Sequence, residues 1–330
     1  MMTSTEIVRS VTGAEVEHFE QYGFVRLKRI LADEEIERLR RATAVALGTL
    51  EASPSHRDLT LRARAAERAN TRADTKHIAA KVPAPFPGAQ FGSVRDRARD
   101  IALAEHHSVP SAGHFLTDSG VWRRNEAICE FALRSELPQI AAGLMGAYAV
   151  RFYDDQLVLK EPDTAERTAF HQDLSYLHID GDKGCVFWVF LDRARRGLGR
   201  IGYVPSSHRW GHVFKPNNLI SESPCPGAEG ADMPGIESAP DSFGVQYIDI
   251  DPGDILVHHV LTLHGMEGNR GTAPCRALGF CYVDAALHHR LRPGVAISPS
   301  HNRAARDGSE MDAKAHPIVW PRFESEALAG

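Results

Sequence analysis

The run that decides the fold is AVRFYDDQLVLK, residues 149–160, together with five similar runs that follow it. Each run is short and either alternates between apolar and polar residues or is apolar throughout, which is typical of β-strands. Turn-forming clusters such as RARRGLG and GNRGTAP separate the runs. Many short strands at this spacing predict an all-β sandwich or barrel. The other runs are CVFWVFLD (185–192), RIGYVP (200–205), VQYIDI (245–250), DILVHHVLTLH (254–264) and RALGFCYVDA (276–285).

The N-terminal part of the chain is predicted to be mostly helical. Thr12 and Glu15 have the spacing of a capping box for a first helix, which is expected to stop at Gly23. An alternating strand is expected over 24–31. Asp33 is expected to cap a second helix, DEEIERLRRATAVALGTL, whose acidic first turn suits the helix dipole.

The whole chain, 1–330, is interpreted as one domain in which helices buttress a C-terminal β core. Residues 125–145 are again predicted to be helical. The connection 215–245 is long and rich in Pro, Gly, Ser and Glu, so it is a candidate lid or binding loop. An arginine-rich stretch within 51–125 is interpreted as a solvated face. The expected parts are a mostly helical 1–150, a β core at 151–290 and a C-terminal tail at 291–330.

Composition limits the classes of protein to consider. The 330 residues are 43% hydrophobic and carry a formal charge of −5, which argues against a nucleic-acid partner or an anionic membrane surface. No apolar run is long enough for a membrane helix, and the start of the chain lacks the apolar stretch of a secretory signal. The five cysteines are scattered, and none belongs to a CxxC pair. A reducing cytoplasm is therefore the expected compartment.

The histidines carry the chemical signal. There are 17 of them, and three lie in HxD motifs, where composition alone predicts about one such motif. The motifs are His56-Arg57-Asp58, His171-Gln172-Asp173 and His178-Ile179-Asp180. Only His171 follows a plausible strand, on which residues i and i+2 point to one face. With a second histidine, such a pair forms a two-histidine, one-carboxylate face that leaves open positions on iron(II).

The second histidine is expected from residues 254–265, DILVHHVLTLHG. Strand alternation places His258 and His264 on one face, so either of them can pair with His171. Arg276 follows twelve residues after His264, beyond a turn, and folding back would place it on the neighbouring strand. A guanidinium there suits a dicarboxylate, because arginine binds carboxylates through two parallel hydrogen bonds.

These segments together carry a resemblance to a family. EHFEQYGFVRLKRILADEEIERLR, QLVLKEP with HQD, GYVPSSHRWG, PGDILVHHVLTLHGMEGNR and CRALGFCYVDA resemble the phytanoyl-CoA dioxygenase family of iron(II)- and 2-oxoglutarate-dependent oxygenases. The resemblance extends over most of the chain and is weakest at 51–125 and 215–245. It implies a mainly β fold with buttressing helices, the double-stranded β-helix or cupin-like jelly roll.

The resemblance also implies roles for six residues and a cofactor set of iron(II), 2-oxoglutarate and O2. Met266 departs from the serine often found two places after the family's second histidine. His258 is then expected to be a core residue or to support the ligands. The implied iron ligands are His171, Asp173 and His264; Arg276 is expected to hold the distal carboxylate of 2-oxoglutarate, with Gln156 and Trp188 lining its site.

The expected function is a dioxygenase that hydroxylates a small organic molecule, such as a natural-product intermediate, and releases succinate and CO2. Related halogenases lack the ligating carboxylate, so Asp173 predicts hydroxylation, desaturation or epoxidation rather than halogenation. Two alternatives are a non-catalytic cupin-like binding protein and a zinc- or manganese-dependent cupin isomerase or hydrolase. Arg276 argues against both, since neither needs to hold a dicarboxylate.

Overall fold

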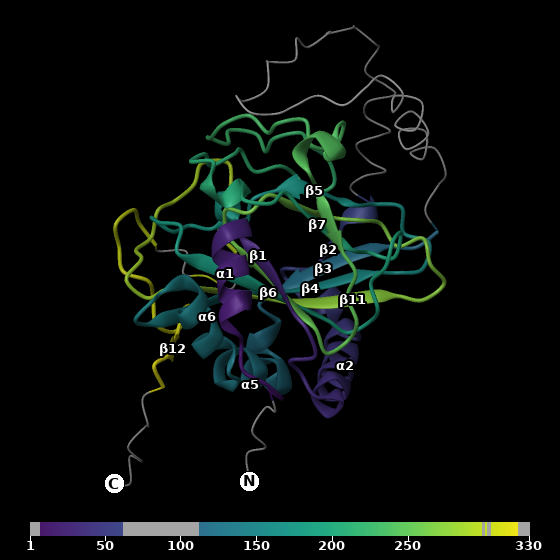
Figure 1. Cartoon of the computed structure of the whole chain (residues 1–330), viewed down its shortest axis with the longest axis horizontal. Helices are drawn as coiled ribbons and strands as arrows, with labels where there is room; N and C mark the ends of the chain where they lie inside the picture. The colour runs from purple at the N-terminus through teal and green to yellow at the C-terminus, as the bar shows by residue number, and fades with distance from the viewer. Residues whose placement is uncertain (1–6, 62–111, 299–300, 302–304, 323–330) are drawn as a thin grey trace, which may run out of the picture.

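The computed structural model describes residues 7–61, 112–298, 301 and 305–322. Two antiparallel sheets face each other, as the jelly-roll prediction requires (Figure 1). In sheet order, the large sheet consists of β1 (Phe24–Leu27), β9 (Ile255–His259), β6 (Gly184–Phe190), β11 (Cys275–Asp284), β4 (Val150–Lys160), β3 (Phe115–Ser119) and β2 (Arg57–Asp58), with β12 (Ile318–Trp320) paired to β4. The small sheet consists of β5 (Thr168–His171), β10 (His264–Met266), β7 (Ile201–Tyr203) and β8 (Gln246–Ile248).

Strand β6 shows why the large sheet has two apolar faces. All seven of its residues are buried, which explains its unbroken apolar sequence. Phe187 and Val189 pack in the cluster beneath the helices, whereas Trp188 and Phe190 pack in the cluster between the sheets. Alternation along one strand therefore divides the protein into an outer core, on the helix side, and an inner core, between the sheets.

The helices cover the outer face of the large sheet (Figure 1). They are α1 (Gly13–Tyr22), α2 (Asp33–Leu47), α5 (Glu126–Arg134) and α6 (Leu137–Met145). The capping box of Thr12 and Glu15 is confirmed, and Gly23 ends α1 in the left-handed conformation. The expectation for Asp33 is wrong by one position, because Ala32 is the N-cap and Asp33 lies in the first turn. Short 3-10 helices lie at Leu50–Ala52, Val121–Arg123, Asp173–Tyr176, Ser207–Arg209 and Pro240–Phe243.

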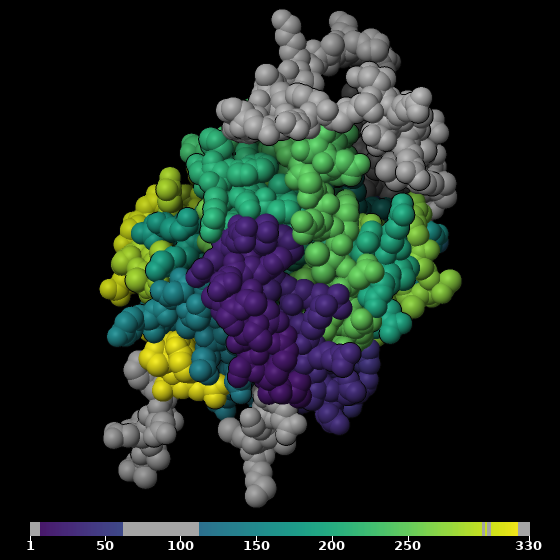
Figure 2. All heavy atoms as spheres, in the orientation of Figure 1, coloured from purple at the N-terminus to yellow at the C-terminus, as the bar shows by residue number. Residues whose placement is uncertain are grey.

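The long connection 215–245 lies against the small sheet. Phe214 and Ile236 pack with Phe170 and Val204 in a third, smaller apolar cluster. The predicted C-terminal tail is not merely a tail, since β12 adds a strand to the large sheet. In the space-filling view, the purple N-terminal region occupies the middle of the visible face (Figure 2). Most of the 51–125 stretch, including its arginine-rich part, lies outside the described residues.

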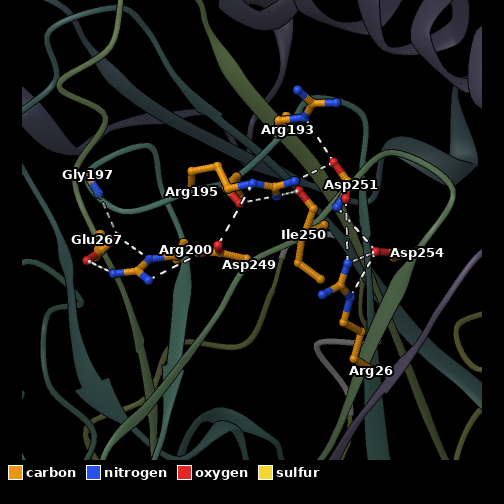
Figure 3. A network of polar contacts seen from close by, with 11 residues as sticks. Arg26, Arg193, Arg195, Gly197, Arg200, Asp249, Ile250, Asp251, Asp254 and Glu267 are labelled. Atoms are coloured by element: carbon orange, nitrogen blue, oxygen red, sulfur yellow. Dashed lines mark hydrogen bonds and ion pairs between the residues drawn. The ribbon is translucent and has the colours of Figure 1, made fainter.

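A network of ion pairs connects Arg26 of the large sheet with Arg200 beside the small sheet, through Asp251, Arg195 and Asp249 (Figure 3). Arg26 of β1 binds Asp254 at 2.5 Å, and the same carboxylate accepts the backbone N–H of Arg29 at 2.8 Å. Arg200, beside β7, binds Glu267 just after β10 at 3.0 Å. Several linked pairs hold the connecting loops together here better than isolated surface pairs do. Within the described residues, no helix has the length and apolar character needed to cross a membrane.

Candidate active site

The small sheet brings the three predicted metal ligands together. His171 is the last residue of β5 and pairs in register with His264, the first residue of β10, while Asp173 begins the 3-10 helix after β5. Nε2 of His171 lies 3.5 Å from Oδ1 of Asp173, and Nε2 of His264 lies 3.7 Å from the same oxygen. One donor atom from each residue lies within 4.8 Å of the others, which is the spacing of atoms around a shared cation.

Backbone carbonyls fix both imidazoles in the same way. Nδ1 of His171 lies 2.8 Å from the carbonyl of Ala169, and Nδ1 of His264 lies 2.9 Å from the carbonyl of Thr262. A carbonyl only accepts, so each Nδ1 carries the proton and each Nε2 keeps its lone pair. This is how metal-binding histidines are usually oriented, so both imidazoles present Nε2 to one point.

His258 fixes the carboxylate of Asp173. Its Nε2 lies 2.6 Å from Oδ2 of Asp173, and its Nδ1 lies 3.1 Å from the hydroxyl of Tyr203. The buried Tyr203 keeps its proton, since burial raises its pKa well above the usual value, and therefore donates to Nδ1. Nε2 then donates to Asp173, so Oδ2 is occupied and Oδ1 faces the two histidines. Both ring nitrogens of His258 are thus engaged, and its contact orients Asp173.

The protonation states suit metal binding. Burial alone would raise the pKa of Asp173, but the adjacent imidazoles of His264, His171 and His258 favour its ionised form and hold the pKa well below its usual range. Burial holds the pKa of His264 well below its usual value. A metal ion requires an ionised carboxylate and neutral imidazoles, and these are the forms that the surroundings favour.

A glycine allows the two strands to bring the ligands close. Between His264 and Met266 the pairing of β10 with β5 shifts register. A Cβ on Gly265 would lie 2.9 Å from the carbonyl of Thr168 and 3.3 Å from the backbone nitrogen of Phe170. Backbone atoms cannot move aside cheaply, so this close approach requires glycine.

The triad faces a cavity of about 270 Å³ between the sheets. Most of its wall is apolar, and its size fits a small molecule. Of the segment 215–245, only Leu219 lines it among the described residues, so this segment forms a small part of the wall. Besides the triad, the lining includes Phe115, Tyr153, Asp154, Gln156, Val158, His178, Val186, Trp188, Ile201, Met266, Gly279, Cys281 and His301.

Gln156 and Trp188 both line the cavity, as the family resemblance implies. They belong to one row across the sheet, with Gly279 of β11 between them. A Cβ on Gly279 would come within 3.1 Å of the Trp188 ring, so the glycine makes room for the indole. Nε1 of Trp188 is buried and has no hydrogen-bond partner among the described residues. An N–H left unpaired at a cavity wall is suited to donate to a bound ligand.

Arg276 does not reach this cavity, and the prediction of its role needs correction. Its guanidinium binds Asp192 through two bonds of 2.8 Å, and its backbone N–H donates to the same carboxylate at 3.0 Å. Ala277 and Cys281 of β11 pack in the inner core, whereas Leu278 and Phe280 pack in the outer core. Arg276 therefore projects to the outer face, and it does not distinguish a dioxygenase from the two alternative functions.

Sequence reasoning missed several polar residues of the cavity. Nε2 of His301 lies 3.1 Å from Oδ2 of Asp154 at the cavity wall, and His178 lines the same cavity. His178 belongs to an HxD motif, yet among the described residues only His171, Asp173 and His264 form a group able to hold a metal. Lys160, at the end of β4, lies on the inner face of the sheet. Its only signal in the sequence is its spacing of two and four residues from Val158 and Gln156, which places all three on one face of the strand.

Two curated relatives are enzymes with related descriptions. A probable alpha-ketoglutarate-dependent hypophosphite dioxygenase of Stutzerimonas stutzeri is 26% identical over 138 residues, which are 41% of this chain and 46% of that protein. The peroxisomal phytanoyl-CoA dioxygenase of Bos taurus is 20% identical over 195 residues, which are 58% of this chain and 56% of that protein. The chain thus spans about half the length of the curated relatives it matches.

Solved structures share the fold over nearly the whole chain. The epimerase SnoN of nogalamycin biosynthesis, in complex with Fe3+, alpha ketoglutarate and nogalamycin RO, has a TM-score of 0.60 at 17% identity. That match covers 93% of this chain and 97% of SnoN. EctD from S. alaskensis, with 2-oxoglutarate and 5-hydroxyectoine, has a TM-score of 0.56 at 16% identity and covers 95% of this chain and 90% of EctD. Both comparisons confirm the jelly-roll fold.

The family is settled by a match along the sequence. The pattern of the phytanoyl-CoA dioxygenase (PhyH) family matches residues 19–277, which is most of the chain. The match includes both strands of the small sheet that carry the triad, and it includes the cavity wall from β3 to β6. The chain belongs to the phytanoyl-CoA dioxygenase (PhyH) family.

Proposed function

We propose that the protein is an iron(II)- and 2-oxoglutarate-dependent dioxygenase that oxidises a small organic molecule. The observation that carries the proposal is the convergence of two Nε2 atoms and one carboxylate oxygen on a single point at the cavity wall. Each of the three side chains is held from behind by a hydrogen bond. Two histidines and one carboxylate are the ligand set of non-haem iron(II) oxygenases.

Iron(II) and 2-oxoglutarate together would supply the activation of O2, with release of succinate and CO2. His171, Asp173 and His264 would hold the metal from one side and leave its other positions to the cavity. Trp188 would donate its unpaired N–H to the co-substrate, and Gln156 lies across Gly279 from it. The protein's own work is to bind, to orient and to exclude water.

The substrate is proposed to be a small molecule bound at the polar end of the cavity. Asp154, His178 and His301 line that part of the wall and offer hydrogen-bond donors and acceptors. The apolar remainder suits the carbon skeleton of an organic compound. Because Asp173 is present as a ligand, hydroxylation, desaturation or epoxidation is the proposed outcome rather than halogenation. The five cysteines are all unpaired, which supports a reducing cytoplasm as the place of action.

The test is succinate formation from 2-oxoglutarate by the iron(II)-loaded protein, with and without O2. We expect succinate only in the presence of O2, and we expect Asp173→Ala to lower its formation by about 100-fold or more, because the carboxylate is a ligand. The matched control is Asp180→Ala. Asp180 is the carboxylate of another HxD motif, and it is exposed and accepts the backbone N–H of His288.

Two outcomes would contradict the proposal. Full activity in Asp173→Ala would remove this residue from the metal site. A protein that binds iron(II) stoichiometrically but forms no succinate with O2 would instead be a non-catalytic cupin-like metal-binding protein. If succinate does form, a panel of small acids, terpenoids and amino-acid derivatives, screened for faster succinate formation, would identify the class of substrate.

A further inference from the structure

The cavity wall lacks a positive charge where the proposed co-substrate needs one. Asp154, Asp155 and Asp173 contribute to the lining, and no arginine or lysine lines the cavity among the described residues. The co-substrate 2-oxoglutarate is a dianion, and a buried carboxylate without a partner is costly. The cation expected for this task, Arg276, lies on the outer face and already binds Asp192.

Lys160 is a cation on the inner face of the same pair of strands. It is the last residue of β4 and pairs with Cys275 of β11 and with Phe115 of β3. It alternates in step with Gln156 and Val158, which both line the cavity. Its side chain is completely buried, which is rare for lysine unless the ammonium has partners.

The contacts of this ammonium leave it short of partners. Nζ donates to the carbonyl of Glu267 at 2.7 Å and to that of Met266 at 3.3 Å, and it lies 4.4 Å from the centre of the Phe115 ring. An ammonium has three donors, and the third has no acceptor among the described residues. Within this part of the chain Lys160 also has no ion pair, although Glu166 lies near enough to act on it.

The ammonium lies beside residues that line the cavity, and one of them is two positions along β10 from the proposed ligand His264. Phe115 and Met266, which contact Nζ, both line the cavity. Met266 follows the proposed ligand His264 by two residues along β10, which corresponds to about 7 Å. This spacing between the backbone positions of His264 and Met266 is of the order of the length of a five-carbon dicarboxylate, so a co-substrate with its first carboxylate at the metal extends along β10 towards Nζ. The distal carboxylate would then meet the unused donor of Lys160.

We propose that Lys160, and not Arg276, binds the distal carboxylate of 2-oxoglutarate in this protein. This inference rests on the proposed function, since it names the residue that selects the co-substrate. Met266 fits the same arrangement: its unbranched side chain leaves the carboxylate without a hydroxyl partner there, so the ammonium supplies the main contact.

The test compares two ligands that differ only in the distal carboxylate. Binding of 2-oxoglutarate and of 2-oxopentanoate to the anaerobic, iron(II)-loaded protein is measured by calorimetry, without turnover. The wild-type protein is expected to prefer 2-oxoglutarate by about 10- to 100-fold, as a charge-assisted hydrogen bond implies. In Lys160→Met the preference should fall towards one. Arg276→Met is the matched control, since it removes a cation from the other face of the same strand pair, and it should keep the full preference.

The outcomes separate this inference from the proposed function. If the wild-type protein prefers 2-oxoglutarate and Lys160→Met keeps that preference, Lys160 is not the anchor, but the proposed function stands. Loss of the preference in Arg276→Met would likewise overturn the inference. If the wild-type protein binds neither acid, the proposed function itself fails.

A second variant guards against a folding defect in Lys160→Met. Lys160→Gln keeps an N–H donor for the two carbonyls but removes the charge, and its ligand preference should also fall. A circular-dichroism melt establishes that each variant is folded. If neither variant folds, the wild-type protein decides the matter. It must prefer 2-oxoglutarate to 2-oxopentanoate, and equal affinities for the two acids would overturn the inference.

Discussion

Strands β4 and β11 carry one cation on each face, and the two cations have opposite surroundings. Arg276 projects outwards, is 23% exposed and forms a two-bond ion pair with Asp192. Lys160 projects inwards, is fully buried and has no ion pair among the described residues. The two lie in adjacent rows of the same ladder, because Arg276 pairs with Leu159 and Cys275 pairs with Lys160.

The difference separates residues that stabilise the fold from residues that are available to bind a ligand. A cation with its carboxylate beside it is satisfied and contributes to folding, whereas a buried cation without one is costly unless a ligand completes it. The same division holds across the sheet, since the outer core lies under the helices and the inner core borders the cavity. We therefore expect substitutions on the outer face to change stability and substitutions on the inner face to change binding.

The largest effects on stability and on ligand binding are expected for substitutions of two neighbouring residues of β6, Phe187 and Trp188. Phe187 is completely buried in the outer core, so Phe187→Ala should lower the free energy of unfolding by about 3–5 kcal/mol. Trp188→Phe, on the inner face, should cost less than about 1.5 kcal/mol, since it preserves an aromatic ring. It should nevertheless weaken 2-oxoglutarate binding several-fold through loss of the unpaired N–H. Urea denaturation measures the free energy of unfolding, and ligand titration measures the affinity for 2-oxoglutarate. If Phe187→Ala changed mainly the affinity and Trp188→Phe mainly the stability, the assignment of the two faces would be refuted.

The neighbouring residues His258 and His259 test whether only the inward-facing residue affects iron(II) binding. His258 faces inwards and holds Asp173, so His258→Phe should weaken iron(II) binding by about 10- to 100-fold. His259, the next residue, points away and lies beside Phe19 and His208, so His259→Phe should leave metal affinity unchanged. Competition with a chelator of known affinity gives both values. Equal losses in the two variants would mean that His258 acts only through packing.

The pH dependence of ligand binding sharpens the comparison further. Burial lowers the pKa of Lys160 to about 7, while the charges of Glu166 and Glu267 partly oppose this by attraction and Arg167 adds to it by repulsion. Burial raises the pKa of the Cys275 thiol to about 12, so this group stays neutral near pH 7. Below pH 7 the amine is already protonated, and 2-oxoglutarate affinity should be nearly constant on this account.

Above pH 7, binding has to bring a proton to the amine, because the bound carboxylate raises the pKa of Lys160. Affinity for 2-oxoglutarate should then fall by up to about tenfold per pH unit, until the pKa of the complex is reached. Lys160→Arg carries a charge that does not titrate in this range, so its decline should be much smaller. Calorimetry between pH 6.5 and 8.5 measures the slopes. A steep decline that persists in Lys160→Arg would point to the histidines instead.

The triad could be predicted from the sequence because each step used a strong local rule. The HxD motif follows a strand, alternation limits the second histidine to His258 or His264, and the family resemblance selects His264. The structure adds what the sequence does not contain, namely that the other histidine, His258, holds Asp173 in place. Folding brings His171 and His264 into register across two strands that are nearly a hundred residues apart in the chain.

Arg276 could not be placed in the same way, because the face of a strand residue depends on register. A shift of one residue moves every side chain to the other face, and the turn of GNRGTAP does not reveal where β11 begins. The strand begins at Cys275, which puts Cys275 inside and Arg276 outside. Lys160 gives no distinct signal for a related reason, since a lysine at the end of an apolar run also suits an exposed strand end.

The smallest effect is expected for the outer cation itself. Arg276 and Asp192 are 23% and 18% exposed, so solvent weakens their attraction, and Arg276→Met should lower the free energy of unfolding by only about 1 kcal/mol. Asp192→Asn should cost about the same, and the double variant should cost little more than either single variant, because both remove one interaction. None of the three should alter the preference for 2-oxoglutarate over 2-oxopentanoate. A variant that kept its stability but lost this preference would show that Arg276 turns inwards when the ligand binds, and the assignment of the two faces would have to be reversed.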